Sequence, residues 1–241
     1  MVDKLGLLHE GKAKKVFATT NPDLVWMEFK DDATAFNGLK KGTITDKGLL
    51  NAAITIHLYH ILEKEGIPTH FVRKMSSREL LVRAVKIIPI EFVVRNIAAG
   101  SLAKRMGVEE GLDLKLPVLE FYYKDDALND PMINEYHIKA FDLARAEHIE
   151  RAKDYAFKVN DILSQCFQEA GLILVDFKLE FGLDSKGEVL LADEISPDSC
   201  RLWDAATKEK LDKDRFRRDL GAVEDAYREV WKRLREGKKC L

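Results

Sequence analysis

The chain has 241 residues, of which 46% are hydrophobic and 33% are charged, and its formal net charge at pH 7 is -2. This size and balance are typical of a soluble globular protein with one large domain or two modest lobes. The nearly neutral charge argues against a role confined to nucleic-acid binding, and no apolar run is long enough to span a membrane.

The cysteines and the N-terminus predict a cytoplasmic protein. Cys166, Cys200 and Cys240 are widely spaced and match neither a zinc-binding nor a disulfide pattern. The first fifteen residues lack the charged start and the long apolar stretch of a signal peptide. We therefore expect a reducing compartment.

The first part of the chain is predicted to be rich in strands. Residues 13–19 and 24–30 contain many β-formers and are separated by an Asn-Pro-Asp turn. Residues 46–66 have the periodicity of an amphipathic helix that ends at Gly66. Further strands are predicted at residues 69–75, 79–87 and 90–97. Together these elements predict a small, mostly antiparallel lobe.

The second part alternates helices and strands. A helix is predicted to begin within residues 98–106, and a long helix covers residues 144–171. The apolar stripe of the long helix consists of Ile149, Ala152, Ala156, Val159, Leu163, Phe167 and Ala170. A hairpin follows, and one charged helix over residues 214–237 ends the pattern. We expect an α+β fold with lobes at residues 1–88 and 89–241 and a ligand cleft between them.

The predicted hairpin carries an unusual row of charges. In the strand at residues 175–182 every second side chain points to the same face, so Asp176, Lys178 and Glu180 share one face. If residues 184–187 form the loop, Lys178 faces Asp193 and three carboxylates surround one lysine.

Two interpretations of this charged face are possible. It is either a solvated face of an antiparallel sheet or a site for a Mg²⁺-nucleotide complex. Mg²⁺ takes oxygen ligands and typically uses one or two carboxylates together with substrate phosphates. Because carboxylates that cluster need a cation, we favour a site in which Glu180 and Asp193 hold Mg²⁺.

Three other segments combine residues suited to anions. In residues 10–17, Lys12 and Lys14 lie on one strand face, as in a phosphate-binding flap or a solvated edge strand. In residues 93–105, a strand ends in Arg95, and Gly100 and Ser101 begin a helix, which suits a phosphate or is a plain turn. The loop at residues 193–204 contains Asp198, Ser199 and Arg201, and residues 124–131 form a similar but weaker pattern.

The motifs favour phosphoryl transfer over covalent acyl-enzyme chemistry. The sequence contains no G-x-S-x-G motif and no candidate Cys/His pair. Lysines, arginines and carboxylates for Mg²⁺ are the groups by which proteins position and stabilise a transferring phosphoryl group.

Taken together, the segments EGKAK, PIEFVVRNIAAGS, DFKLEFG and DEISPDSCRLWD resemble the SAICAR synthetases of purine biosynthesis, from about Glu10 to the final helix. The resemblance implies ATP-dependent ligation of L-aspartate to carboxyaminoimidazole ribonucleotide (CAIR) through an acyl phosphate. It also implies Mg²⁺ and a two-lobed α+β fold with an ATP cleft, related to ATP-grasp enzymes and kinases.

The same resemblance implies roles for individual residues. The nucleotide would contact Lys12, Ala13, Lys14, Val16, Arg83 and the segment near Lys86. Glu180 and Asp193 would hold Mg²⁺, Lys178 would act at the reacting groups together with Lys14, and Asp176 would orient Lys178. CAIR would be held by Arg95, Ser101, Arg201 and Asp198, and Asp130 would support a second metal or the aspartate amine.

Two alternatives stay open from the sequence. One is a small-molecule kinase on a related fold, and the other is a nucleotide-binding module without catalysis. We expect small-molecule substrates, no nucleic-acid or membrane partner, and a homo-oligomer, with a dimer favoured.

Overall fold

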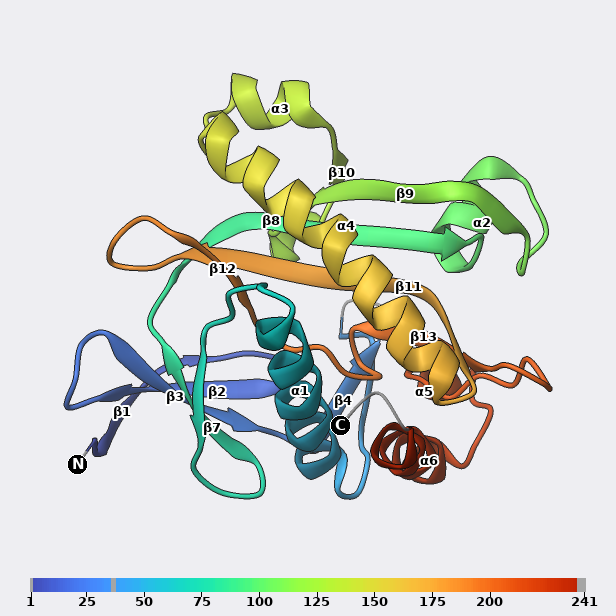
Figure 1. The fold of residues 1–241 in the computed structure, drawn as a ribbon, viewed down its shortest axis with the longest axis horizontal. Helices are drawn as coiled ribbons and strands as arrows, with labels where there is room; N and C mark the ends of the chain where they lie inside the picture. The colour runs from blue at the N-terminus through green and yellow to red at the C-terminus, as the bar shows by residue number, and fades with distance from the viewer. Residues whose placement is uncertain (1, 36–37, 238–241) are drawn as a thin grey trace.

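The structure, a computed structural model, describes residues 2–35 and 38–237. It confirms a mixed α+β fold in which helices pack on antiparallel sheets (Figure 1). The first sheet has the strand order β1-β2-β3-β7-β6. Its strands are β1 (Lys4–Glu10), β2 (Lys14–Thr19), β3 (Leu24–Phe29), β6 (Phe71–Lys74) and β7 (Glu79–Arg83). A separate small hairpin consists of β4 (Asp32–Ala35) and β5 (Lys40–Thr43).

The second sheet has the order β10-β9-β8-β11-β12, and a further strand, β13, also pairs with β11. Its strands are β8 (Lys86–Ile97), β9 (Asp113–Tyr123), β10 (Met132–Ile133), β11 (Leu172–Leu183), β12 (Val189–Ala192) and β13 (Cys200–Asp204). The long strands β8 and β11 lie next to each other at its centre. The chain passes from the first sheet to the second at residues 84–85.

The helices are α1 (Lys47–Lys64), α2 (Gly100–Met106), α3 (Glu135–Ala140), α4 (Ala146–Glu169), α5 (Asp214–Arg217) and α6 (Val223–Glu236), with a 3₁₀ helix, η1, at Asp126–Leu128. In Figure 1, α4 runs across the second sheet and α1 lies against the first. The predicted apolar stripe of α4 is buried, as expected. Among residues 2–35 and 38–237, no helix is long and apolar enough to cross a membrane.

The hydrophobic core is continuous between the two sheets. One cluster of buried side chains includes residues of β3 and α1 as well as residues of β8, β11 and α4. At its centre the ring of Phe92 packs edge-to-face on Phe121 and Phe181, with centroid distances of 5.3 and 5.1 Å. An isolated bridge between Thr69 and Leu191 also joins the first part of the chain to β12. The division into lobes at residues 1–88 and 89–241 therefore stays a proposal.

The predicted hairpin register is wrong by one residue. Leu183 pairs with Val189 rather than with Glu188, because Glu188 belongs to the loop. The Asp184 carboxylate accepts hydrogen bonds from the backbone N–H groups of Lys186 (2.8 Å) and Glu188 (2.9 Å), which fixes this longer turn.

Asp193 nevertheless reaches the predicted face. In a regular strand the shifted register would turn its side chain to the core face. Asp193 instead leaves β12 with a left-handed φ of 64°, and its carboxylate lies 3.1 Å from Nζ of Lys178. A local backbone change thus restores the contact that the register shift would have removed.

The prediction of one helix over residues 214–237 is also wrong. The chain breaks between α5 and α6, where Asp219, Gly221 and Ala222 all have left-handed φ angles. The guanidinium of Arg215 donates to the carbonyls of Gly221 (2.7 Å) and Leu220 (3.2 Å), so a side chain replaces the helical hydrogen bonds at the break.

The expectation about cysteines needs a correction. Cys166 is disulfide-bonded, which the wide spacing of the cysteines did not predict. Cys200 is a free and buried thiol, as expected. Cys240 lies outside the described residues.

Candidate active site

A cleft of about 940 Å³ is lined by residues of both sheets and of the loop that follows β12. It contains nearly all of the predicted site residues: Lys12, Ala13, Lys14, Val16, Arg83, Arg95, Ser101, Asp130, Asp176, Lys178, Glu180, Asp193, Asp198 and Arg201. Lys86 is the exception, because its exposed side chain lies outside the cleft while Val85 and Ile87 line it.

One part of the cleft is apolar. Val16 of β2, Val25 and Met27 of β3, and Val82 of β7 belong to the same sheet and line the cleft together. Nearby, Nη1 of Arg83 donates to the carbonyl of Thr69 at 2.9 Å. Such an apolar surface with a few polar groups at its edge is suited to a flat base.

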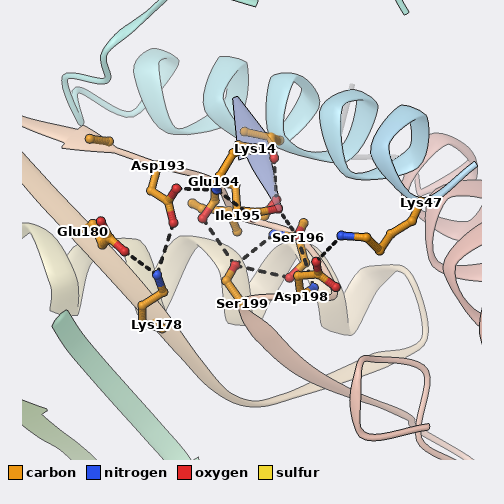
Figure 2. A network of polar contacts seen from close by, with 12 residues as sticks. Lys14, Lys47, Lys178, Glu180, Asp193, Glu194, Ile195, Ser196, Asp198 and Ser199 are labelled. Atoms are coloured by element: carbon orange, nitrogen blue, oxygen red, sulfur yellow. Dashed lines mark hydrogen bonds and ion pairs between the residues drawn. The ribbon is translucent and has the colours of Figure 1, made fainter. Parts of the chain in front are cut away.

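The charged face of β11 forms the floor of the cleft. Figure 2 shows Nζ of Lys178 between two carboxylates, at 2.5 Å from Glu180 and 3.1 Å from Asp193. A third carboxylate, that of Glu91 on β8, lies 3.4 Å away. Burial lowers the pKa of Lys178, but these three carboxylates raise it by a larger amount, so the net pKa is well above its usual range. Lys178 is therefore a permanent cation.

Lys14 at the start of β2 reaches the same cluster from the opposite sheet. Its Nζ contacts the Asp193 carboxylate and lies 2.7 Å from Oε1 of Glu194 (Figure 2). Burial lowers the pKa of Lys14, and the two carboxylates raise it by more. Burial also raises the pKa of Asp193, whereas Lys14 and Lys178 lower it, and the net pKa is below the usual range. Lys14, Lys178 and Asp193 are thus ionised at neutral pH.

A second cluster of charged side chains surrounds Asp176, two residues before Lys178 on β11. The buried guanidinium of Arg95 donates to Asp176 (2.6 Å), Glu120 (2.7 Å) and the hydroxyl of Ser101 (3.1 Å). Arg201 of β13 contributes Nη1 at 2.7 Å from the same Asp176 carboxylate. Asp176 therefore contacts the two arginines rather than Lys178, although the sequence predicted that it would orient Lys178.

Gly100 explains how closely Arg201 packs against the start of α2. Its φ is +53°, and a Cβ atom at this position would lie 2.6 Å from Nη2 of Arg201. A residue with a side chain would be strained here and would displace the guanidinium.

A third cluster of polar contacts surrounds the Asp198 carboxylate. Its Oδ2 accepts from Nζ of Lys47 at 2.7 Å (Figure 2), and its Oδ1 accepts from the hydroxyl of Tyr227 at 2.6 Å. Burial raises the pKa of Asp198, while Lys213 and Lys47 lower it, so that the carboxylate stays ionised. Both oxygens are held in place.

The loop with Asp130 forms one side of the cleft. Oδ1 of Asp130 accepts from the backbone N–H of Asp125 at 3.0 Å. Asp126 on the same loop lies 2.6 Å from Nζ of Lys12, which extends from the opposite sheet. The pair joins the predicted flap to this loop at the edge of the cleft.

Sequence reasoning missed several residues of the site. Glu91 could have been found, because it alternates onto the same face of β8 as Arg95 and pairs with Glu180. Glu194 is adjacent to Asp193 in sequence, but only the left-handed turn at Asp193 explains why both carboxylates reach Lys14. Lys47 and Tyr227 carried no local signal, because they are 151 and 29 residues away from Asp198.

Glu180 and Asp193 provide carboxylate oxygens, which are the type of ligand that Mg²⁺ takes. Both are carboxylates that contact the same Nζ of Lys178, so their oxygens converge on one point of the cleft. Within the part of the chain that the structure describes, no group of three or more His, Cys, Asp or Glu side chains could hold a metal. Mg²⁺ typically takes one or two protein carboxylates and completes its shell with water and phosphate oxygens.

The model of the family described as SAICAR synthetase matches residues 7–234. The chain belongs to the SAICAR synthetase family. Members of this family are ligases, and this chain is a ligase enzyme.

Individual relatives agree with the family. The phosphoribosylaminoimidazole-succinocarboxamide synthase of Thermoanaerobacter sp. strain X514 is 60% identical over 97% of this chain and 99% of its own length. The synthase of Ehrlichia chaffeensis has a crystal structure with a TM-score of 0.93 and 49% identity, covering 95% of this chain and 98% of that one. A SAICAR synthetase in complex with ADP has a TM-score of 0.91 and 49% identity, covering 94% and 96%.

Proposed function

We propose that the protein joins L-aspartate to the carboxylate of CAIR with cleavage of ATP to ADP and phosphate, and that it does so in purine biosynthesis. The observation that carries this proposal is the position of Lys178 on β11. Its Nζ lies among three carboxylates, while Arg95 of β8 and Arg201 of β13 both contact Asp176, two residues earlier on β11. All of these side chains line one cleft, which supports a nucleotide site next to an anion site.

The reaction needs an activated carboxylate. An amine does not displace oxide from a carboxylate, since oxide is a very poor leaving group. Transfer of the γ-phosphoryl group of ATP to a CAIR carboxylate oxygen forms an acyl phosphate and releases ADP. The aspartate amine then attacks the acyl carbon, the carbon–oxygen bond to phosphate breaks, and inorganic phosphate leaves while the nitrogen loses a proton to give the neutral amide.

Lys178 and Lys14 provide the positive charge that the transferring phosphoryl group requires. Both are partly buried, charged at neutral pH and held by carboxylates, so little reorganisation is needed at the moment of reaction. Glu180 and Asp193 would hold Mg²⁺, which when bound neutralises charge on the phosphate oxygens.

The remaining residues would bind the substrates. Lys12, Ala13, Lys14 and Val16 form the flap over the nucleotide, and Arg83 with the segment near Lys86 encloses adenine and ribose. Arg95, Ser101 and Arg201 hold the CAIR phosphate, because two guanidinium groups and a hydroxyl provide the donors that a phosphate accepts. Asp198 binds the ribose or imidazole, and Asp130 supports a second metal or the aspartate amine.

The wider setting is part of the same proposal. The lobes at residues 1–88 and 89–241 would close on the substrates and protect the acyl phosphate from water, as in ATP-grasp enzymes and kinases. We propose a cytoplasmic homodimer that works with ATP and Mg²⁺.

The test is the dependence of ADP formation on each substrate. Mg-ATP is incubated with CAIR, with L-aspartate, and with both, and the products are identified by mass spectrometry. The proposal requires that ADP forms over many turnovers only with both and that CAIR gains the mass of aspartate minus water. ADP formation over many turnovers with CAIR alone would indicate a kinase instead. Binding of Mg-ADP without turnover under any condition would indicate a non-catalytic nucleotide-binding module.

A further inference from the structure

Lys47 occupies a position that its own helix does not favour. It is the first residue of α1, where the positive end of the helix dipole disfavours a cation. Its side chain is only 1% exposed, and removing an ammonium group from water is costly unless an anion pairs with it. The reason for a lysine here must therefore lie outside α1.

That reason is Asp198. Nζ of Lys47 lies 2.7 Å from Oδ2 of Asp198, whose side chain is 4% exposed. The hydroxyl of Tyr227, a fully buried residue of α6, donates to Oδ1 at 2.6 Å. Lys213 is a more distant cation, with its Nζ 3.8 Å from Oδ2. Two helices from opposite ends of the chain thus fix the two oxygens of one carboxylate.

The backbone next to Asp198 is also fixed. The N–H of Asp198 donates to the hydroxyl of Ser196 at 3.1 Å, and this hydroxyl donates to Glu194 at 2.6 Å. Figure 2 shows this chain of contacts from Lys14 through Glu194 and Ser196 to Asp198 and Lys47. The Asp198 carboxylate is therefore held in one orientation by the contacts to its two oxygens and by the hydrogen bond of its own backbone N–H.

Asp198 lines the cleft, whereas Lys47 and Tyr227 lie behind it. Each carboxylate oxygen can accept two hydrogen bonds, and the closest contacts from Lys47 and Tyr227 use one on each oxygen. Capacity to accept from a ligand hydroxyl or N–H group is left on both oxygens.

From this arrangement we propose that Lys47 is a positioning residue for CAIR. It holds the Asp198 carboxylate in one orientation at the wall of the cleft, with Tyr227 of α6 as the second support. Lys47 itself does not touch the substrate. This inference rests on the proposed function, because Asp198 must contact CAIR for Lys47 to matter.

The test compares Lys47→Met with Lys47→Arg and Tyr227→Phe. In Lys47→Met the nearest cation of a buried carboxylate is lost, and we expect the KM for CAIR to rise about tenfold or more, with the KM for ATP within about twofold. Lys47→Arg restores the charge and should recover part of the loss, and Tyr227→Phe should raise the KM for CAIR by less. The melting temperature of each variant is measured alongside.

Arg228→Met is the matched control. Nη2 of Arg228 on α6 lies 3.2 Å from Asp46, next to the start of α1, so this exposed pair joins the same two helices without contacting Asp198. Its loss should leave both KM values unchanged. A second control is Asp198→Asn, on which Lys47→Met should add little further increase in the KM for CAIR.

The outcomes separate the two proposals. Absence of CAIR-dependent turnover in the unmodified protein would refute the proposed function. Normal turnover in the unmodified protein, combined with an unchanged KM for CAIR and a lower melting temperature in Lys47→Met, would show that Lys47 only joins the helices. An equal rise in the KM values for CAIR and ATP would also overturn the positioning role.

Discussion

Replacing Lys178 by methionine should abolish most of the turnover and leave nucleotide binding nearly intact. Nζ of Lys178 lies 2.5, 3.1 and 3.4 Å from Glu180, Asp193 and Glu91. In the proposed reaction this ammonium group faces the phosphoryl group as it moves between oxygens. Removing one donor aimed at developing charge costs about 3–4 kcal/mol, or a factor of about 10²–10³ in kcat. Because Lys14 remains, we expect the KM for Mg-ATP to change by less than about threefold, since ground-state contacts affect KM and transition-state contacts affect kcat.

The assay is steady-state ADP release with saturating CAIR and L-aspartate, together with titration of Mg-ADP binding. Lys153→Met is the matched control, because Nζ of Lys153 lies 2.7 Å from Glu135 and 3.1 Å from Glu150 on the surface, away from the cleft. Its removal should affect neither quantity. If Lys178→Met retained more than about a tenth of the original kcat, the role of Lys178 in charge stabilisation would be refuted.

Three further predictions follow from other parts of the molecule. Glu180→Gln removes a Mg²⁺ ligand, so it should weaken Mg-ADP binding more than CAIR binding in calorimetry; equal losses would mean that the two sites are not separate. Phe92→Ala empties the ring cluster with Phe121 and Phe181 and should lower the free energy of unfolding by about 3–5 kcal/mol in urea titrations, whereas a loss below about 1 kcal/mol would contradict the packing. Burial and Lys14 lower the pKa of His70 to about 4, although Asp193 opposes this. Its neutral form therefore contributes stability above pH 6.5 that is lost as the pH falls toward 4. In His70→Phe the decline of the unfolding free energy over this range should be shallower, and an identical decline would refute the assignment.

The charged face of β11 was predictable because its signal is local. Alternation in one strand is enough to place Lys178 and Glu180 on the same face, and burial of Phe177, Leu179 and Phe181 fixes which face that is. The contact between Asp193 and Lys178 was predicted correctly, but from a hairpin register that is wrong by one residue. Loop length determines register, and the hydrogen bonds of Asp184 that lengthen the loop were not foreseen.

The other errors concern long-range or backbone effects. The break between α5 and α6 depends on Arg215, which bonds the freed carbonyls of Leu220 and Gly221, and a helical periodicity carries no trace of it. Strand β1 was not predicted at all. The family resemblance implied that Asp176 orients Lys178, but the contacts of Asp176 are with Arg95 and Arg201, which come from β8 and β13. Local pattern therefore predicted which residues face the cleft better than it predicted their partners.

The most direct test of the account follows one oxygen atom. CAIR labelled with ¹⁸O in its carboxylate is converted with Mg-ATP and L-aspartate, and the released phosphate is analysed by mass spectrometry. The account predicts one ¹⁸O atom in each phosphate formed, with no phosphate released when L-aspartate is omitted. Unlabelled phosphate accompanying amide formation would contradict activation of the carboxylate by phosphorylation.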